Sequence, residues 1–292
     1  MKLASPQSWF IRCGITAALS LSVYAAISSA GPKAPPLPVR RDGAETLLDR
    51  YVNEPVPSVL LAGSSLTTRL NAEYFDTPGL KILGIAGGSA ITPLKVALAR
   101  DRLPKTILVE LNFLERGEDS ELVQKFTSSS VPVWPRPLKS AIAFYERWHH
   151  PPLDRTKAKA AALALLDEPP SDFDNRIYLE RAVQASKTAP LEGIMMSNLV
   201  TLKRLVAEIE ARGSRVYFYS LPLAGPVQVS IAAKAEAAAA HAAFSDDQRW
   251  IQLDGSMPDL RWADGVHLDE RSSVMMAKEI DRFLKDRSKD AL

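Results

Sequence analysis

The stretch PSVLLAGSSLTTRL, residues 57–70, decides how the chain folds. Its first half, PSVLLAG (57–63), is an apolar run ended by small residues, which is typical of a short buried strand. Its second half, SSLTTRL, places serine hydroxyls where they can cap the N-terminus of a helix. The pattern therefore predicts a strand that ends in a turn carrying Ser64 and Ser65.

Four further apolar runs repeat this pattern along the chain. They are residues 80–84, 106–111, 215–222 and 250–254. Helical spacing of apolar residues predicts helices at 92–100, 197–212 and 270–285. Strands that alternate with helices predict an α/β fold, with a parallel sheet covered on both faces.

The segment at about 116–190 departs from this alternation. It contains VPVWPRP, RWHHPPLDR and DEPPSDFD, in which prolines interrupt helices and strands. We therefore expect an insertion of short helices and loops after the third strand. Because ligands of open α/β sheets bind at the carboxyl ends of the strands, we expect this insertion to form a cap over the site.

The first 30 residues have the composition of an export signal. Lys2 and Arg12 precede an uncharged stretch that ends in the small residues Ser28, Ser29 and Ala30. This order predicts a secretory signal peptide, with retention of residues 1–30 as a membrane anchor as the alternative. In both cases the body, 57–292, is expected in the periplasm or outside the cell, after a linker at 31–56.

Charge and cysteine content exclude several classes of function. Without residues 1–30, the chain has 34 Lys and Arg against 34 Asp and Glu. Because binding to phosphates needs a basic excess, we expect no nucleic acid partner. The one cysteine, Cys13, lies in the export segment, so the body has no disulfide or zinc thiolate site. His149 and His150 lack a second cluster of ligands, and we expect no metal or cofactor.

Three residues far apart in the sequence can carry nucleophilic chemistry. Ser65 follows the first predicted strand, and WADGVHLDE holds Asp264 and His267 three positions apart before the last helix. Taken separately, the serine is also explained as a helix cap and the Asp-His pair as a solvated turn. Together they can meet at the carboxyl edge of one sheet, where base and orienting carboxylate activate a hydroxyl.

Four short blocks of the chain resemble those of the SGNH (GDSL-like) hydrolases. VLLAGSSLT is similar to the block that carries the nucleophile, with Ser65 in that position and Ser64 where aspartate is usual; DGVH is similar to the last block. The resemblance implies a three-layer, flavodoxin-like fold. It also implies Ser65 as nucleophile, His267 as base and Asp264 as orienter.

The two middle blocks suggest the donors of an oxyanion hole. GIAGGSA implies that the N–H of Gly87 joins the N–H of Ser65, with Gly88 as the alternative. LVELNFLER implies the side-chain amide of Asn112 as the third donor. This block lacks the glycine and the following aspartate of the family pattern, and an end-of-strand turn is the other explanation of Asn112.

The resemblance implies a serine-dependent O-acyl ester hydrolase or O-acyltransferase, with an acetyl group on an envelope or extracellular carbohydrate as the expected substrate. A membrane-bound protein that donates acyl groups is the expected partner of a transferase. Arg69, one turn beyond Ser65, could bind a carboxylate or a sugar hydroxyl, or be a surface arginine. The alternative function is an inactive SGNH-like module that binds carbohydrate or supports an assembly.

Overall fold

The computed structural model describes residues 6–30, 43–128, 154–188 and 190–289. Residues 129–153 of the expected insertion, with His149 and His150, lie outside these ranges. The chain divides into two units, Met1–Pro38 and Val39–Leu292. The described residues of the first unit form the helix α1 (Pro6–Ala30). Among the residues described, none of the helices combines the length and the apolar character needed to cross a membrane.

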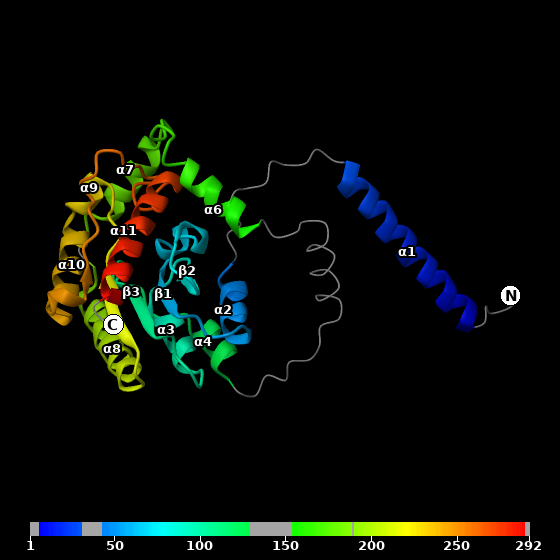
Figure 1. Ribbon diagram of the computed structural model, residues 1–292, viewed down its shortest axis with the longest axis horizontal. Coiled ribbons are helices and arrows are strands. Elements are labelled where there is room, and N and C mark those ends of the chain that lie inside the picture. The colour runs from blue at the N-terminus through cyan, green and yellow to red at the C-terminus, as the bar shows by residue number, and fades with distance from the viewer. Residues whose placement is uncertain (1–5, 31–42, 129–153, 189, 290–292) are drawn as a thin grey trace. The chain divides into compact units, whose positions relative to one another are not determined.

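The second unit is built on a five-stranded sheet (Figure 1). Its strands are β1 (Val59–Ser64), β2 (Leu80–Ile85), β3 (Thr106–Glu110), β4 (Arg215–Tyr219) and β5 (Trp250–Ile251). Their order is β2-β1-β3-β4-β5, and every neighbouring pair is parallel. This order is that of flavodoxin-like sheets. The predicted α/β fold with a parallel sheet is confirmed.

Helices surround the sheet because alternate residues of each strand point to opposite faces. In β1, Leu60 belongs to one hydrophobic core and Leu61 to the other. Helices α2 (Ala44–Asn53), α3 (Ile91–Leu98), α8 (Glu192–Ala211) and α10 (Ile231–Ala243) contribute to the first core. Helices α6 (Arg155–Ala164) and α11 (Glu270–Lys289) contribute to the second.

Helix α2 lies inside the segment 31–56 that the sequence predicts as a linker. Its apolar residues recur at helical spacing, and Leu48 and Tyr51 are completely buried in the first core. The guanidinium of Arg100 donates hydrogen bonds to the carbonyls of Tyr51 and Glu54. Residues 44–53 are therefore packed with the sheet, and the expected linker is wrong over this stretch.

The turn after β1 is shorter than the helix that its serines suggest. In its place lies a 3-10 turn, η1 (Thr67–Arg69), and the backbone is extended at Leu70 before a second 3-10 turn, η2 (Ala72–Tyr74). The N–H of Leu66 donates to the hydroxyl of Ser64, and the N–H of Thr67 to the carboxylate of Glu110. Side chains therefore bind the N–H groups of this turn, which places Ser65 directly at the sheet edge.

Three helices occupy the described parts of the segment 116–190. They are α4 (Ser120–Thr127), α6 and α7 (Arg176–Ala185). Asp119 and Asp154 cap the first two, accepting hydrogen bonds from the N–H groups of Leu122 and Thr156. A short helix, α9 (Gly225–Gln228), follows β4.

Candidate active site

Ser65, His267 and Asp264 form one hydrogen-bonded chain at the carboxyl edge of the sheet. The Oγ of Ser65 lies 2.8 Å from Nε2 of His267, and Nδ1 of the same ring lies 2.7 Å from Oδ2 of Asp264. Ser65 is half-buried, and the His267 side chain is 20% exposed. Residues separated by some 200 positions thus meet with the geometry needed for proton transfer from a hydroxyl.

The carboxylate of Asp264 is held by its own loop. Its Oδ1 accepts hydrogen bonds from the backbone N–H of Val266 and of His267, at 3.1 and 2.8 Å. Burial alone would raise the pKa of Asp264, but the hydrogen bonds from the His267 ring and backbone outweigh it and lower the pKa to about 2. Asp264 is therefore charged at neutral pH, and it favours the tautomer in which Nδ1 carries the proton.

The loop that carries Asp264 and His267 is braced on two sides. Its own backbone closes it, because the N–H of Ala263 donates to the carbonyl of His267 at 2.8 Å. Gly265 is buried at φ +86°, and a Cβ there would lie 3.0 Å from the side chain of Leu179 on α7. The side-chain amide of Asn175, the N-cap of α7, donates to the carbonyl of Trp262 at 2.5 Å. The segment 116–190 thus contacts the loop.

The glycines after β2 differ in what their backbone can offer. Gly87 is exposed at φ +76°, with open space where a Cβ would stand. Gly88 donates its N–H to the carbonyl of Ile85 at 3.0 Å, within the same turn. The alternative donor Gly88 is therefore occupied, while Gly87 has the conformation that only glycine adopts readily.

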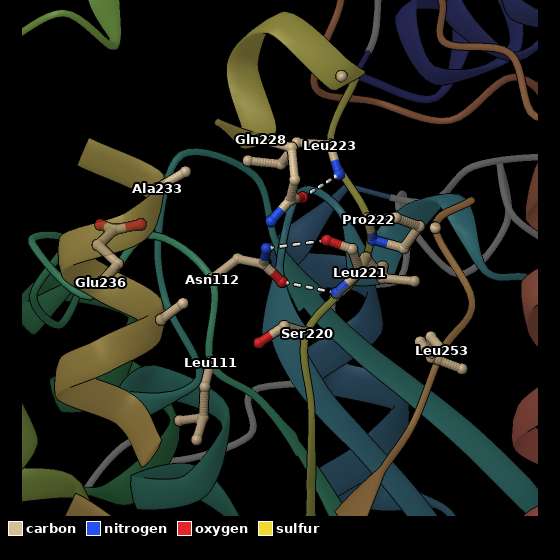
Figure 2. A pocket seen from close by; sticks show the side chains of 13 residues that line it. Leu111, Asn112, Ser220, Leu221, Pro222, Leu223, Gln228, Ala233, Glu236 and Leu253 are labelled. Carbon is tan, nitrogen blue, oxygen red and sulfur yellow. Dashed lines mark hydrogen bonds between the residues drawn. The ribbon is translucent and has the colours of Figure 1, made fainter. Parts of the chain in front are cut away.

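Asn112 follows β3, and its side chain is hydrogen-bonded to the chain that follows β4. Its amide donates to the carbonyl of Leu221 at 3.0 Å, and its oxygen accepts the N–H of Leu221 at 2.8 Å. Figure 2 shows this pair of bonds between the ends of β3 and β4. Asn112 is thus a bridge between two strand ends, and the structure does not join it to Ser65.

A pocket of about 330 Å³ lies beside this bridge (Figure 2). It is lined by Asn112, by residues 220–223 after β4 and by Glu236 on α10. Glu236 accepts the N–H of Phe113 at 3.2 Å. Burial raises the pKa of Glu236 to about 7, with a further contribution from the charge of Glu115 and against the backbone N–H groups that bind it. The polar groups named here already have partners in the protein.

Glu110 is the residue of this region to which the sequence reasoning assigned no role. It is the one charged residue in the apolar run TILVEL, and that anomaly was the available signal. Its carboxylate is buried at the end of β3 and binds both Ser64 and Thr67, which flank Ser65. Arg69 ends η1, is half-buried and already interacts within the protein.

Nothing in the described part of the chain resembles a metal centre, since no three His, Cys, Asp or Glu side chains are grouped to hold an ion. Comparisons of the chain with models of protein families, with curated proteins and with solved structures gave no match. The resemblance to SGNH hydrolases therefore rests on its short motifs alone. What is established is the α/β fold and the geometry around Ser65.

Proposed function

We propose that the protein is a serine-dependent enzyme of the SGNH type that cleaves or transfers O-acyl esters. One observation carries the proposal: the Oγ of Ser65 is hydrogen-bonded to His267, whose other nitrogen is bonded to Asp264. A serine hydroxyl is a poor nucleophile until a base removes its proton, and this chain of contacts supplies the base and its orienting group.

In the proposed reaction, Nε2 of His267 takes the proton of Ser65 as Oγ attacks the ester carbonyl. The imidazolium that forms is stabilised by Asp264, and it then gives the proton to the departing alcohol. The acyl group remains on Ser65 as an ester. Water or a sugar hydroxyl attacks this ester and loses its proton to His267. His267 then returns the proton to the departing Oγ of Ser65, so both residues regain their starting state.

For the tetrahedral oxyanion we assign the backbone N–H groups of Ser65 and Gly87. Gly87 is exposed and at positive φ, which suits close approach of backbone to a reacting carbonyl. The amide of Asn112 would have to leave its bond with the carbonyl of Leu221, or use its second N–H, to join them. Asn112 is accordingly the least supported of the three donors.

We propose an acetylated carbohydrate of the envelope as the substrate class, in the periplasm or outside the cell. The support is the export-like composition of residues 1–30 together with the SGNH resemblance. The contact of α7 with the loop around Gly265 supports a cap role for the segment 116–190. A transferase would also need an acyl donor, for which a membrane-bound partner is proposed.

The competing function is a binding module without turnover. The bond between Asn112 and Leu221 favours it, because it reduces the donors available to an oxyanion. The intact contacts of Ser65, His267 and Asp264 favour the enzyme, since a binding role gives no reason for this chain of hydrogen bonds.

The deciding experiment is a pre-steady-state reaction of the purified protein with excess p-nitrophenyl acetate. The proposal requires a burst of p-nitrophenol and a mass increase of one acetyl group on the peptide that contains Ser65. Ser65→Ala should abolish both, and Ser58→Ala, an exposed serine before β1, is the matched control. If wild-type protein releases no p-nitrophenol from this ester, forms no acetyl-enzyme and releases no acetate from acetylated polysaccharide, the enzyme proposal fails.

A further inference from the structure

Ser65 lies between two residues that are fastened to the same buried carboxylate. Ser64 donates to Glu110 through its N–H at 2.9 Å and through its hydroxyl at 2.6 Å. Thr67 donates through its N–H at 3.1 Å and also through its hydroxyl. Glu110 is 2% exposed, and it belongs to the neighbouring strand, β3. One carboxylate therefore binds the turn on both sides of Ser65.

One assignment of donors and acceptors gives every group of this network a partner. Tyr219 lies 2.7 Å from the hydroxyl of Thr67; burial and the nearby Glu110 raise the pKa of Tyr219, so its O–H is present to donate. The N–H of Leu66 donates to the Ser64 hydroxyl at 3.1 Å. The hydroxyls of Thr67 and Ser64 each receive one hydrogen bond and pass one on to Glu110. Burial raises the pKa of Glu110, and the hydrogen bonds from Ser64 and Thr67 act against that rise because they stabilise the charged form. In that form the carboxylate accepts all four donors.

The backbone of β1 packs closely against Glu110 and Thr67. A Cβ at Gly63, the residue before Ser64, would overlap the hydroxyl of Thr67 and the carboxylate of Glu110. On the other side of the turn, the hydroxyl of Thr68 donates to the carbonyl of Ser65 at 2.5 Å. The backbone on either side of Ser65 is thus fixed, while its own Oγ is left to meet His267.

We propose that Glu110 is a positioning residue, which holds the turn at Ser65 so that the serine hydroxyl meets His267. This inference rests on the proposed function only for its effect on rate. The geometric part, that the contact between Ser65 and His267 depends on Glu110, holds for any role of Ser65. Glu110 does not reach the reacting atoms, and it acts through Ser64 and Thr67.

The effect on rate follows because a glutamine at position 110 cannot accept all the hydrogen bonds that Ser64 and Thr67 donate. In Glu110→Gln, the new NH2 group faces Ser64 or Thr67 and opposes their donors, so the turn must shift. Misplacement of a reacting group by about 1 Å can cost about 10²-fold in rate. We therefore expect Glu110→Gln to slow reaction at Ser65 by about 10- to 100-fold, with His267 and Asp264 intact.

The test uses the full chain and two measurements, one of the geometry at His267 and one of the reactivity of Ser65. Each can contradict the proposal without the other. The first is the NMR signal of Nε2 of His267, compared at one pH in wild type, Ser65→Ala and Glu110→Gln. The signal of Glu110→Gln should move toward that of Ser65→Ala. The second is the rate of labelling of Ser65 by a fluorophosphonate, followed by intact mass. Both measurements are carried out well below the unfolding temperature of each variant.

Glu236→Gln is the matched control, because Glu236 is another buried glutamate that accepts a backbone N–H but has no contact with the turn. It should change neither measurement. If Glu110→Gln folds and leaves the Nε2 signal and the labelling rate at wild-type values, the positioning role is refuted. If wild type is never labelled, the proposed enzyme function fails, while the Nε2 signal still decides the role of Glu110.

A variant that does not fold would not end the test. Thr67→Val preserves the volume of the side chain and removes one donor to Glu110 together with the contact to Tyr219. Both measurements should then change in the same direction as in Glu110→Gln, by a smaller amount. Unchanged signals in folded Thr67→Val, where Glu110→Gln is unfolded, count against the proposal.

Discussion

At the end of β1, the side chains of Ser65, His267 and Asp264 are bonded to one another; at the end of β3, Asn112 is bonded on both sides to the backbone of Leu221. The two regions share one edge of one sheet. In the first, a hydroxyl remains half-buried with a base beside it. In the second, the amide groups satisfy peptide groups that strand ends leave unpaired. A polar residue after a strand is therefore no guide to function until its partners are known.

The difference between the two regions is tested most directly by removing Ser65 or His267. Ser65→Ala and His267→Ala should each lower kcat by roughly 10⁴- to 10⁶-fold, because each removes a group without which the other cannot act. The double variant should be scarcely slower than either single one. Steady-state hydrolysis of p-nitrophenyl acetate measures all three. Additive losses would mean that the two residues do not work as one unit.

Asp264→Asn should have the next largest effect, a loss of roughly 10²- to 10⁴-fold in kcat. The amide can still accept the backbone N–H groups of Val266 and His267, but it no longer favours the tautomer with a proton on Nδ1. Since the pKa of Asp264 is lowered to about 2, its charge should persist through any mildly acidic assay. An acid limb of the pH–rate profile that lies above pH 4 must therefore belong to another group.

Much of this edge was predictable from residue order alone. Apolar runs such as TILVEL and helical spacing such as that of 197–212 gave the alternation of strands and helices, because burial on both faces of a parallel sheet requires it. The meeting of Ser65 with Asp264 and His267 also followed from topology, since parallel strands place all their carboxyl ends together. Those predictions depended on where residues fall, which the sequence contains.

The roles of other residues depend on which groups their side chains contact in the folded protein, and those contacts cannot be deduced from the order of residues. Asn112 was predicted as an oxyanion donor or a turn residue, whereas its amide is bonded across to Leu221, more than 100 positions away. Helix α2 was missed because Pro-rich neighbours suggested a linker, although its apolar spacing fits a buried face. Glu110 broke an apolar strand visibly, but its bonds to Ser64 and Thr67 required the fold.

Asn112→Ala sharpens the comparison by separating stability from rate. Loss of both bonds to Leu221 should lower the free energy of unfolding by about 1 to 3 kcal/mol, because a buried peptide group loses its partner. A bridge predicts little change in kcat, whereas an oxyanion donor predicts a loss of about 10² to 10³. Asn198→Ala, which removes one bond to the carbonyl of Leu114, is the control for stability alone. Urea unfolding and ester hydrolysis on the same samples distinguish the two roles.

The last expected effect is on stability alone and concerns Glu236, on the Asn112 side of the edge. Its pKa is raised to about 7 by burial, so between about pH 4.5 and 7 the folded protein holds a proton that the unfolded chain has released. Its contribution to stability is then fully present below about pH 4.5 and is lost as pH rises toward 7. Glu236→Gln cannot titrate, and the difference in unfolding free energy between wild type and variant should change by on the order of 2 kcal/mol across this range. Glu208→Gln, at an exposed position of α8, should show no such change.

Urea unfolding of wild type and both variants at pH 5, 6 and 7 measures these differences. A difference between wild type and Glu236→Gln that stays constant with pH would show that Glu236 is charged in the folded protein, and that the Asn112 side of the edge tolerates a charge as the Ser65 side does.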